Sequence, residues 1–301
     1  MGRFPIQMMG FGKQIDILSK SMDNVESTAL GDTYFSIFRG SGLEFKGHRE
    51  YAPGDDARKI DWKASLRSDK LLVKEFFQEK GMDVVFVYDI SDTMLFGSHK
   101  KVKAHYGAEF ILALAGTIIE SNYNVGLVCF SDKIKFSFLP ASGKNQLGLF
   151  FDILSNHSTY GGEYNLDNAL KFVDTTYHPG SVVILVSDFL NMDVPIKYLE
   201  RRFKQMSKKY DFITVVLRDP RDEFMPNENC DIVISDSYGR GSVFLNTGKI
   251  KKQYEEYNKY QKEILRKFLK DVNSDYFELY TDKSFIDPTI AFFKRRDALL
   301  K

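Results

Sequence analysis

From about residue 83 onward, short and nearly continuous apolar runs alternate along the chain with segments of helical pattern. The runs are Val84–Tyr88, Val125–Phe130, Val182–Val186, Phe212–Leu217 and Tyr276–Tyr280. Continuous apolar runs of this length are typical of strands that are buried on both faces. The pattern therefore predicts a parallel sheet that is covered by helices on both faces.

Between these runs, apolar residues recur every three or four positions, which is typical of amphipathic crossover helices. One stripe lies between the first two runs (Val102, Tyr106, Phe110, Leu114, Ile118), one precedes the third (Leu166, Ala169, Leu170, Val173, Tyr177) and one follows it (Ile196, Leu199, Phe203, Met206). The expected fold class is therefore α/β, with a doubly wound, mostly parallel sheet.

Three stretches depart from this alternation. Ile134, Phe136 and Phe138 alternate with polar residues directly after the second run, which predicts an antiparallel edge strand joined by a turn at residues 132–133. Apolar pairs on either side of a glycine-rich loop at 236–241 predict a β-hairpin insertion around 230–247. Residues 249–270 are rich in charge and are expected to form a solvated surface helix.

The first 80 residues have a different character. A helical pattern covers about residues 15–22, and short strand-like pieces lie around 34–38 and 71–76. We therefore expect an N-terminal extension over residues 1–80 and the main α/β domain over residues 81–301.

The amino-acid composition excludes several classes of protein. Of the 301 residues, 43% are hydrophobic and 28% are charged, which excludes disorder for most of the chain. The net charge of +1 provides no overall field for nucleic acid or an anionic membrane, so we expect no nucleic-acid partner. The longest apolar stretch, at 110–119, is too short to span a bilayer. With only two cysteines and no signal-peptide pattern, a cytoplasmic location is expected.

Polar residues follow several of the predicted strands. Asp89, Ser91 and Thr93 come after the first run, Ser187 and Asp188 after the third, and Arg218 and Asp219 after the fourth. Ligands of open parallel sheets bind beyond the carboxyl ends of the strands. Carboxylate and hydroxyl oxygens suit Mg²⁺ or Mn²⁺, whereas the structural alternative is that Ser91 or Asp92 only caps the next helix.

Two motifs in this chain resemble known families. Asp89-x-Ser91-x-Thr93, with Asp188 after a later strand, resembles the metal-ion-dependent adhesion site of von Willebrand factor type A domains. A more specific resemblance lies upstream, in Gly42-Leu-Glu44-Phe45, in Arg49-Glu50-Tyr51-x-Pro53-Gly54-Asp55-Asp56-x-Arg58-x-Ile60-Asp61-Trp62 and in Arg67. It is similar to the signature of the bacterial "domain of unknown function 58" family, whose members carry a von Willebrand A-like domain. The likeness continues through Arg218-Asp219-Pro220 and Thr247-Gly248 and covers about residues 30–300.

The resemblance implies a Rossmann-like, von Willebrand A-like domain that binds partners rather than catalysing a reaction. It also implies a MoxR-type AAA+ ATPase and other von Willebrand A-like proteins as partners. Asp89, Ser91, Thr93 and Asp188 then match the ligands of a Mg²⁺ or Mn²⁺ ion, and a carboxylate of the partner fills the open position. The middle loop departs from the pattern, because Tyr164 stands where a Thr is expected. The site is then weakened, reorganised around Glu163 or Asn165, or empty.

The upstream signature has two interpretations. Its charged and aromatic residues are Arg49, Glu50, Tyr51, Asp55, Asp56, Arg58, Asp61 and Trp62. The structural interpretation, which we favour, is an ion-pair network that fixes the extension to the main sheet, with Asp55 or Asp56 capping a helix that begins near Arg58. The functional interpretation is a docking surface, because Trp and Arg are enriched at binding hot spots.

Other classes of function are less well supported. A Mg²⁺-dependent phosphatase or phosphotransferase with Asp89 as nucleophile is the enzyme alternative, but Ser91 stands where its second carboxylate is needed. No phosphate-binding glycine loop and no nucleophile elbow occur, and the five histidines show no metal or triad spacing. The basic residues between 201 and 209 flank an apolar stripe and are expected to be its solvated face.

Overall fold

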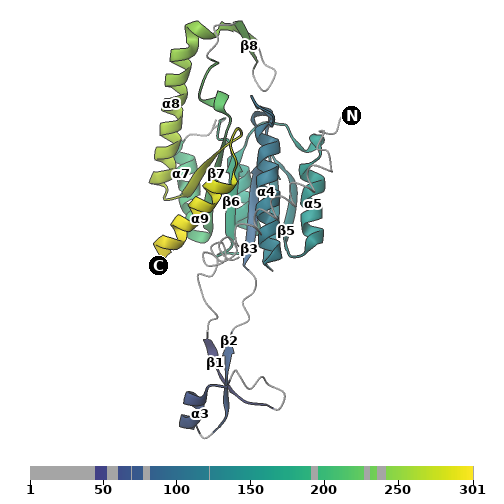
Figure 1. Cartoon of the computed structure of the whole chain (residues 1–301), viewed down its shortest axis with the longest axis vertical. Helices are drawn as coiled ribbons and strands as arrows, with labels where there is room; N and C mark the ends of the chain where they lie inside the picture. Colours follow the sequence, from purple (N-terminus) through teal and green to yellow (C-terminus); the bar gives the residue numbers. More distant parts are fainter. Residues whose placement is uncertain are drawn as a thin grey trace.

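The computed structural model describes residues 45–52, 60–68, 70–76, 82–121, 123–190, 196–226, 231–235 and 242–300. Several predictions fall elsewhere: the helix at 15–22, the strand at 34–38, Gly42–Glu44, Cys230 and the domain boundary at residue 80 lie outside the described residues. The main body is a sheet between two layers of helices (Figure 1).

Among the described strands, six form one sheet in the order β10-β7-β6-β3-β4-β5. The strands are β3 (Asp83–Asp89), β4 (Asn124–Phe130), β5 (Ile134–Ala141), β6 (Val182–Ser187), β7 (Asp211–Arg218) and β10 (Asp275–Tyr280). Only the pairing of β5 with β4 is antiparallel, and the other four pairings are parallel. The predicted parallel sheet and its antiparallel edge strand are both confirmed.

Helices cover both faces of the sheet. One face packs against α4 (Lys103–Glu120), α5 (Lys144–Leu154) and α9 (Ile286–Leu300), and the other against α6 (Leu166–Thr176), α7 (Ile196–Lys209) and α8 (Thr247–Asp271). Alternate residues of β3 enter the two cores, since Phe86 belongs to the first and Val87 to the second. Burial on both faces explains why the strands have continuous apolar sequences.

The chain reverses direction across the sheet between β3 and β6. After β3 it adds β4 and β5 on one side, and it then crosses back to add β6, β7 and β10 on the other. The last pair in the parallel register of β3 and β6 is Tyr88 with Val186. Asp89 and Ser187 follow that pair, so they lie side by side at the topological switch point, where ligands bind in open α/β sheets.

Among the described loops, three contain short 3-10 helices: η2 (Asp92–Leu95), η3 (His157–Thr159) and η4 (Pro220–Asp222). Ser91 precedes η2, but its side chain makes no cap hydrogen bond there. Of the two residues named in the capping alternative, Ser91 therefore provides no side-chain cap. The hydroxyl of Ser91 is instead 3.2 Å from the hydroxyl of Thr93.

The predicted hairpin insertion is confirmed, because β8 (Asp231–Ser235) pairs antiparallel with β9 (Ser242–Asn246). The following helix, α8, was expected to be solvated along its length, and this is wrong for its last turns. Leu265, Phe268 and Leu269 are buried against the sheet, whereas Tyr257 is 61% exposed. The hairpin lies at the N-terminal end of this helix and the sheet at its C-terminal end, as Figure 1 shows along its left side, so the last turns bury one face while their charged residues stay exposed.

A smaller unit precedes the main sheet. It contains β1 (Phe45–Glu50), α3 (Trp62–Ser68) and β2 (Leu72–Phe76), with β1 and β2 antiparallel. The described helix α3 begins at Trp62, and Asp61 caps it by accepting hydrogen bonds from the amides of Lys63 and Ala64. The start of the helix predicted near Arg58 lies outside the described residues. Asp55, Asp56 and Arg58 lie outside the described residues.

Within the part of the chain that the structure describes, no helix is both long and apolar enough to cross a membrane.

Candidate site at the carboxyl ends of the strands

Asp89 ends β3 and is completely buried. One of its carboxylate oxygens, Oδ1, accepts a hydrogen bond from the Ser91 amide, and the other, Oδ2, accepts one of 2.7 Å from the Ser187 hydroxyl. The end of β6 thus holds the carboxylate at the end of β3 in one orientation.

The loops after β3 and β6 bring the remaining predicted ligands together. The Thr93 hydroxyl donates to Asp188 Oδ1 over 3.2 Å and is equally far from the Ser91 hydroxyl. Phe189 adopts a positive φ of 55°, and the tight turn lets the Leu190 amide donate to Asp188 Oδ1. Asp89, Ser91, Thr93 and Asp188 therefore meet in one buried cluster, and their role as metal ligands stays a prediction.

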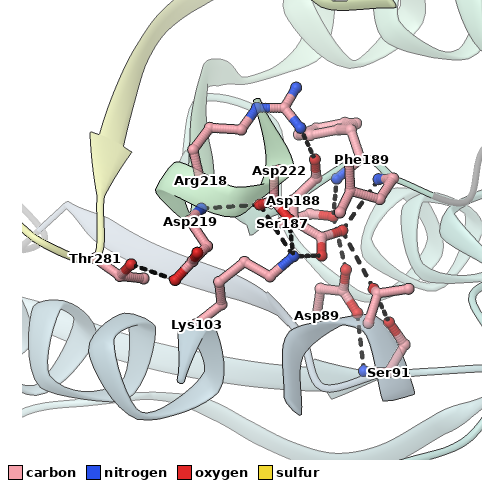
Figure 2. A network of polar contacts seen from close by, with 12 residues as sticks. Asp89, Ser91, Lys103, Ser187, Asp188, Phe189, Arg218, Asp219, Asp222 and Thr281 are labelled. Carbon is pink, nitrogen blue, oxygen red and sulfur yellow. Dashed lines mark hydrogen bonds and ion pairs between the residues drawn. The ribbon is translucent and has the colours of Figure 1, made fainter. Parts of the chain in front are cut away.

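Two residues that were not predicted complete the cluster (Figure 2). The ammonium group of Lys103 is fully buried, and its Nζ lies 2.7 Å from Asp188 Oδ2 and 3.3 Å from Asp222 Oδ2. Asp222 also accepts a hydrogen bond from the backbone amide of Asp219. Lys103 comes from the first turn of α4 and Asp222 from η4, so the network joins the loops after β3, β6 and β7.

Burial and neighbouring charges together set the electrostatics of the cluster. Burial raises the pKa of Asp89 to about 7, and repulsion from the Asp188 carboxylate adds to the shift. Burial by itself lowers the pKa of Lys103, but attraction by Asp188 and Asp222 outweighs it, so the pKa of the ammonium group is raised. Lys103 is therefore positively charged at neutral pH.

The middle loop reaches the site through Tyr164. Gly161 and Gly162 both have positive φ, and a Cβ on Gly162 would lie 3.0 Å from the Ser131 hydroxyl, so glycine permits this close path. The Tyr164 hydroxyl is 3.3 Å from the Ser187 hydroxyl and thus reaches Asp89 through Ser187. Burial and the nearby Asp89 charge raise the pKa of Tyr164 well above its ordinary value, so the phenol stays neutral.

The two neighbours of Tyr164 have other roles or positions. Asn165 caps α6 by accepting a hydrogen bond from the Asn168 amide. Glu163 is exposed at the surface. Neither residue forms part of the buried cluster described above.

Arg218 and Asp219 lie beside the cluster and connect it to the next loops. Arg218 is buried and donates to the backbone carbonyl of Asp188. The Asp219 carboxylate accepts hydrogen bonds from Ser98, from the Arg221 amide and from the Thr281 hydroxyl. Burial opposes its charge, but these bonds outweigh burial and lower the pKa of Asp219. Asp219 therefore holds loops together and does not face Asp89.

The oxygen atoms fit a divalent cation. Adjacent ligands of an octahedral Mg²⁺ ion lie roughly 3 Å apart, because each metal–oxygen bond is about 2.1 Å. The separations of 3.2 Å from the Thr93 hydroxyl to Ser91 and to Asp188 match this spacing. Among the described residues no three His, Cys, Asp or Glu gather in a metal-binding group.

The described part of the upstream signature lies in the small unit. Two side-chain contacts lie within the unit: the His48 ring is hydrogen-bonded to the Asp61 carboxylate at 3.0 Å, and Glu50 forms an ion pair with Lys70. The Arg49 guanidinium donates to the Glu50 carbonyl, and the Tyr51 amide to the Leu71 carbonyl. The Trp62 side chain is 63% exposed.

Exposed apolar side chains surround the buried cluster. Leu95 and Phe96 follow the loop after β3, Leu190 follows Asp188, and Phe224 follows η4. Their exposed fractions are 39%, 45%, 43% and 55%. We call these four residues the strand-end rim. Because they come from the carboxyl ends of three adjacent strands, they lie on the edge of the sheet that holds Asp89 and Asp188.

The strand order β10-β7-β6-β3-β4-β5, with its reversal between β3 and β6 and its antiparallel edge strand, is that of a von Willebrand A-like α/β fold. The model of a protein family described as "Protein of unknown function DUF58" matches residues 47–264, and this chain belongs to that family.

Individual relatives are distant. An uncharacterized protein of Mycobacterium tuberculosis is 20% identical over 210 residues, which are 69% of this chain and 65% of the relative. The chain thus spans less than two thirds of that relative's length. Among solved structures, the conserved hypothetical protein BatB of Bacteroides thetaiotaomicron is 15% identical, with a TM-score of 0.49, over 73% of this chain and 98% of BatB. The SpRpn10 VWA domain is 8% identical, with a TM-score of 0.41, over 71% of this chain and 93% of that domain.

Proposed function

We propose that this chain is a non-enzymatic adaptor whose strand-end edge docks a partner protein. The observation that carries the proposal is the strand-end rim, in which Leu95, Phe96, Leu190 and Phe224 expose apolar surface around a buried polar cluster. Apolar side chains gathered on one face are typical of interaction sites. The partner that we propose is a MoxR-type AAA+ ATPase, with which the adaptor assembles, activates or remodels other proteins in the cytoplasm.

We further propose that docking is assisted by Mg²⁺ or Mn²⁺ held by Asp89, Ser91, Thr93 and Asp188. The support is the spacing of their oxygens and the excess of negative charge. In the polar network, Asp89, Asp188, Asp219 and Asp222 outnumber Lys103 and Arg218. A divalent cation would offset that excess and would supply a Lewis-acidic contact for a carboxylate of the partner.

The arrangement of Asp89 favours binding over nucleophilic catalysis. Its carboxylate is inaccessible to solvent, and both oxygens already accept hydrogen bonds. The neighbouring carboxylate of Asp92 accepts a hydrogen bond from the Gly162 amide and serves the loop geometry. A phosphatase would need an accessible nucleophile and a second carboxylate to act as acid and base.

The test is a direct binding measurement between the purified full chain and the purified MoxR-type ATPase of the same organism, with constant Mg²⁺ and ATP. Phe224→Ser and Leu190→Ser are each expected to weaken binding at least tenfold, because central apolar contacts dominate interface energies. Leu139→Ser is the matched control, since Leu139 is 64% exposed on β5 but lies near the opposite end of the sheet.

The same measurement separates the two parts of the proposal. Binding that is lost in the rim variants and in Asp89→Ala/Ser91→Ala supports metal-assisted docking. Binding that survives the double substitution but not the rim substitutions restricts the proposal to its metal-independent form. Binding that is unaffected by the rim variants, or phosphatase turnover that disappears in Asp89→Asn, would overturn the adaptor function.

A further inference from the structure

Lys103 occupies a position that local structure disfavours. It is the first residue of α4, where the positive end of the helix dipole repels a cation, and the first turn of this helix contains no acidic residue. Its side chain is also completely buried, which is rare and costly for lysine. Tertiary contacts therefore hold Lys103 in a position that both the helix dipole and the cost of burial disfavour. Conflicts between local preference and tertiary structure are expected at functional sites.

The contacts of Lys103 all lead to the strand-end site. Its Nζ lies 2.7 Å from Asp188 Oδ2, so the ammonium group occupies one oxygen of a proposed metal ligand (Figure 2). It also pairs with Asp222 at 3.3 Å. The Phe96 ring of the strand-end rim lies over the ammonium group, with 5.7 Å between Nζ and the ring centroid. Lys103 is thus enclosed between the polar cluster and the docking surface.

We infer that Lys103 is an internal counter-ion that pairs with Asp188 in the metal-free protein and competes with a divalent cation for it, so that Lys103 sets the metal affinity of the strand-end site. The inference deepens the proposed metal-assisted docking and rests on it. In the absence of metal, Lys103 prevents uncompensated repulsion between Asp188, Asp89 and Asp222. A bound cation must share the Asp188 carboxylate with Lys103, and the two positive charges repel each other at short range in a buried site.

Two consequences follow from a competing internal cation. The domain keeps its fold without metal, because one positive charge always remains near Asp188. The metal is also bound more weakly than the same oxygen ligands would bind it without Lys103. Asp222 provides an alternative partner for the ammonium group when a metal engages Asp188.

The experiment titrates Mn²⁺ into the full chain by calorimetry and by thermal unfolding, for wild type, Lys103→Met and Lys101→Met. Lys101→Met is the matched control, because Lys101 lies two residues away and pairs with Glu109 at 2.5 Å rather than with Asp188. Lys103→Met is expected to bind Mn²⁺ at least tenfold more tightly than wild type and Lys101→Met. Its metal-free form is expected to unfold several degrees lower, and Mn²⁺ is expected to restore most of the loss.

Each outcome decides between the two ideas. If Lys103→Met binds Mn²⁺ more tightly than wild type, the inference is supported. If the variant binds Mn²⁺ and wild type does not, the inference is still supported, but the proposal that metal assists docking of the wild-type protein fails. If wild type binds and Lys103→Met binds no more tightly, the inference alone is overturned. If neither binds, both are overturned. Should Lys103→Met not fold, Lys103→Gln carries the same comparison, because its amide can still donate to Asp188.

Discussion

The Ser187 hydroxyl donates a 2.7 Å hydrogen bond to Asp89 Oδ2, and this bond joins the ends of two adjacent parallel strands inside the candidate site. The same hydroxyl lies 3.3 Å from the Tyr164 hydroxyl. Ser187 is therefore the point at which the loops after β3 and β6 and the middle loop before α6 meet.

Removing the Ser187 hydroxyl is expected to lower the free energy of unfolding more than removing the Tyr164 hydroxyl, which lies against it. Ser187→Ala leaves a buried carboxylate oxygen without its donor, so we expect a loss of about 1–3 kcal/mol in the free energy of unfolding. Tyr164→Phe keeps the ring that packs at 5.9 Å from Phe130 and should cost less than about 1 kcal/mol. Urea unfolding of both variants checks this, and equal losses would contradict the central role given to Ser187.

The pKa of Asp89 predicts a pH dependence of stability. The carboxyl has a pKa of about 7 in the folded protein and an ordinary value near 3.8. Between these values the folded state binds more protons than the unfolded state, so the stability of the metal-free protein falls as the pH rises from about 4 to 7. Asp89→Asn should remove this part of the slope and should stabilise the metal-free protein at pH 8.

Urea unfolding at several pH values in the presence of a chelator measures this slope. Asp152→Asn, which changes an exposed aspartate of α5, is the control and should keep the wild-type slope. If Asp89→Asn keeps the wild-type dependence of stability on pH, other titrating groups cause that dependence.

Asp219 is expected to be structural. Asp219→Ala leaves donors of Ser98, Arg221 and Thr281 without their acceptor, so we expect a loss of about 3 kcal/mol or more in stability. Asp282→Ala, in the exposed part of a neighbouring loop, should change stability by less than about 0.5 kcal/mol. Thermal unfolding distinguishes them, and a near-neutral Asp219→Ala would show that these loops are held by other contacts.

The two parts of α8 are expected to respond differently to truncation. Leu269 is fully buried, so Leu269→Ala should lower the free energy of unfolding by about 2–5 kcal/mol. Tyr257 is 61% exposed, and Tyr257→Ala should cost no more than about 0.5 kcal/mol. Chemical denaturation of the two variants tests whether the last turns of the helix belong to the core. Equal and small losses would restore the expectation of a solvated helix.

The spacing of apolar residues along the chain was sufficient to predict those elements whose burial follows directly from that spacing. The runs that became β3, β4, β6 and β7 are continuous because both faces are buried, and alternation at Ile134–Phe138 marked the edge strand. The helices α5 and α9 were not predicted, although Leu147, Phe150, Phe151 and Leu154 show helical spacing in α5. This signal was available. The same holds for the last turns of α8, because Leu265, Phe268, Leu269 and Val272 recur at helical spacing there.

The sequence by itself determined the α/β class, the edge strand and the hairpin, because each follows from local spacing. The rule that strand ends of a parallel sheet share one edge also placed Asp89, Ser91, Thr93, Ser187, Asp188, Arg218 and Asp219 at one edge. The narrower set Asp89, Ser91, Thr93 and Asp188 came from the resemblance to the von Willebrand A motif. Only the tertiary structure decided that Lys103 and Asp222 join that set and that Asp219 does not. A lysine at the start of a helix looks like a surface residue in any local pattern. Its burial beside Asp188 depends on contacts between groups 85 residues apart, and long-range electrostatic pairing leaves no periodic signal along the chain.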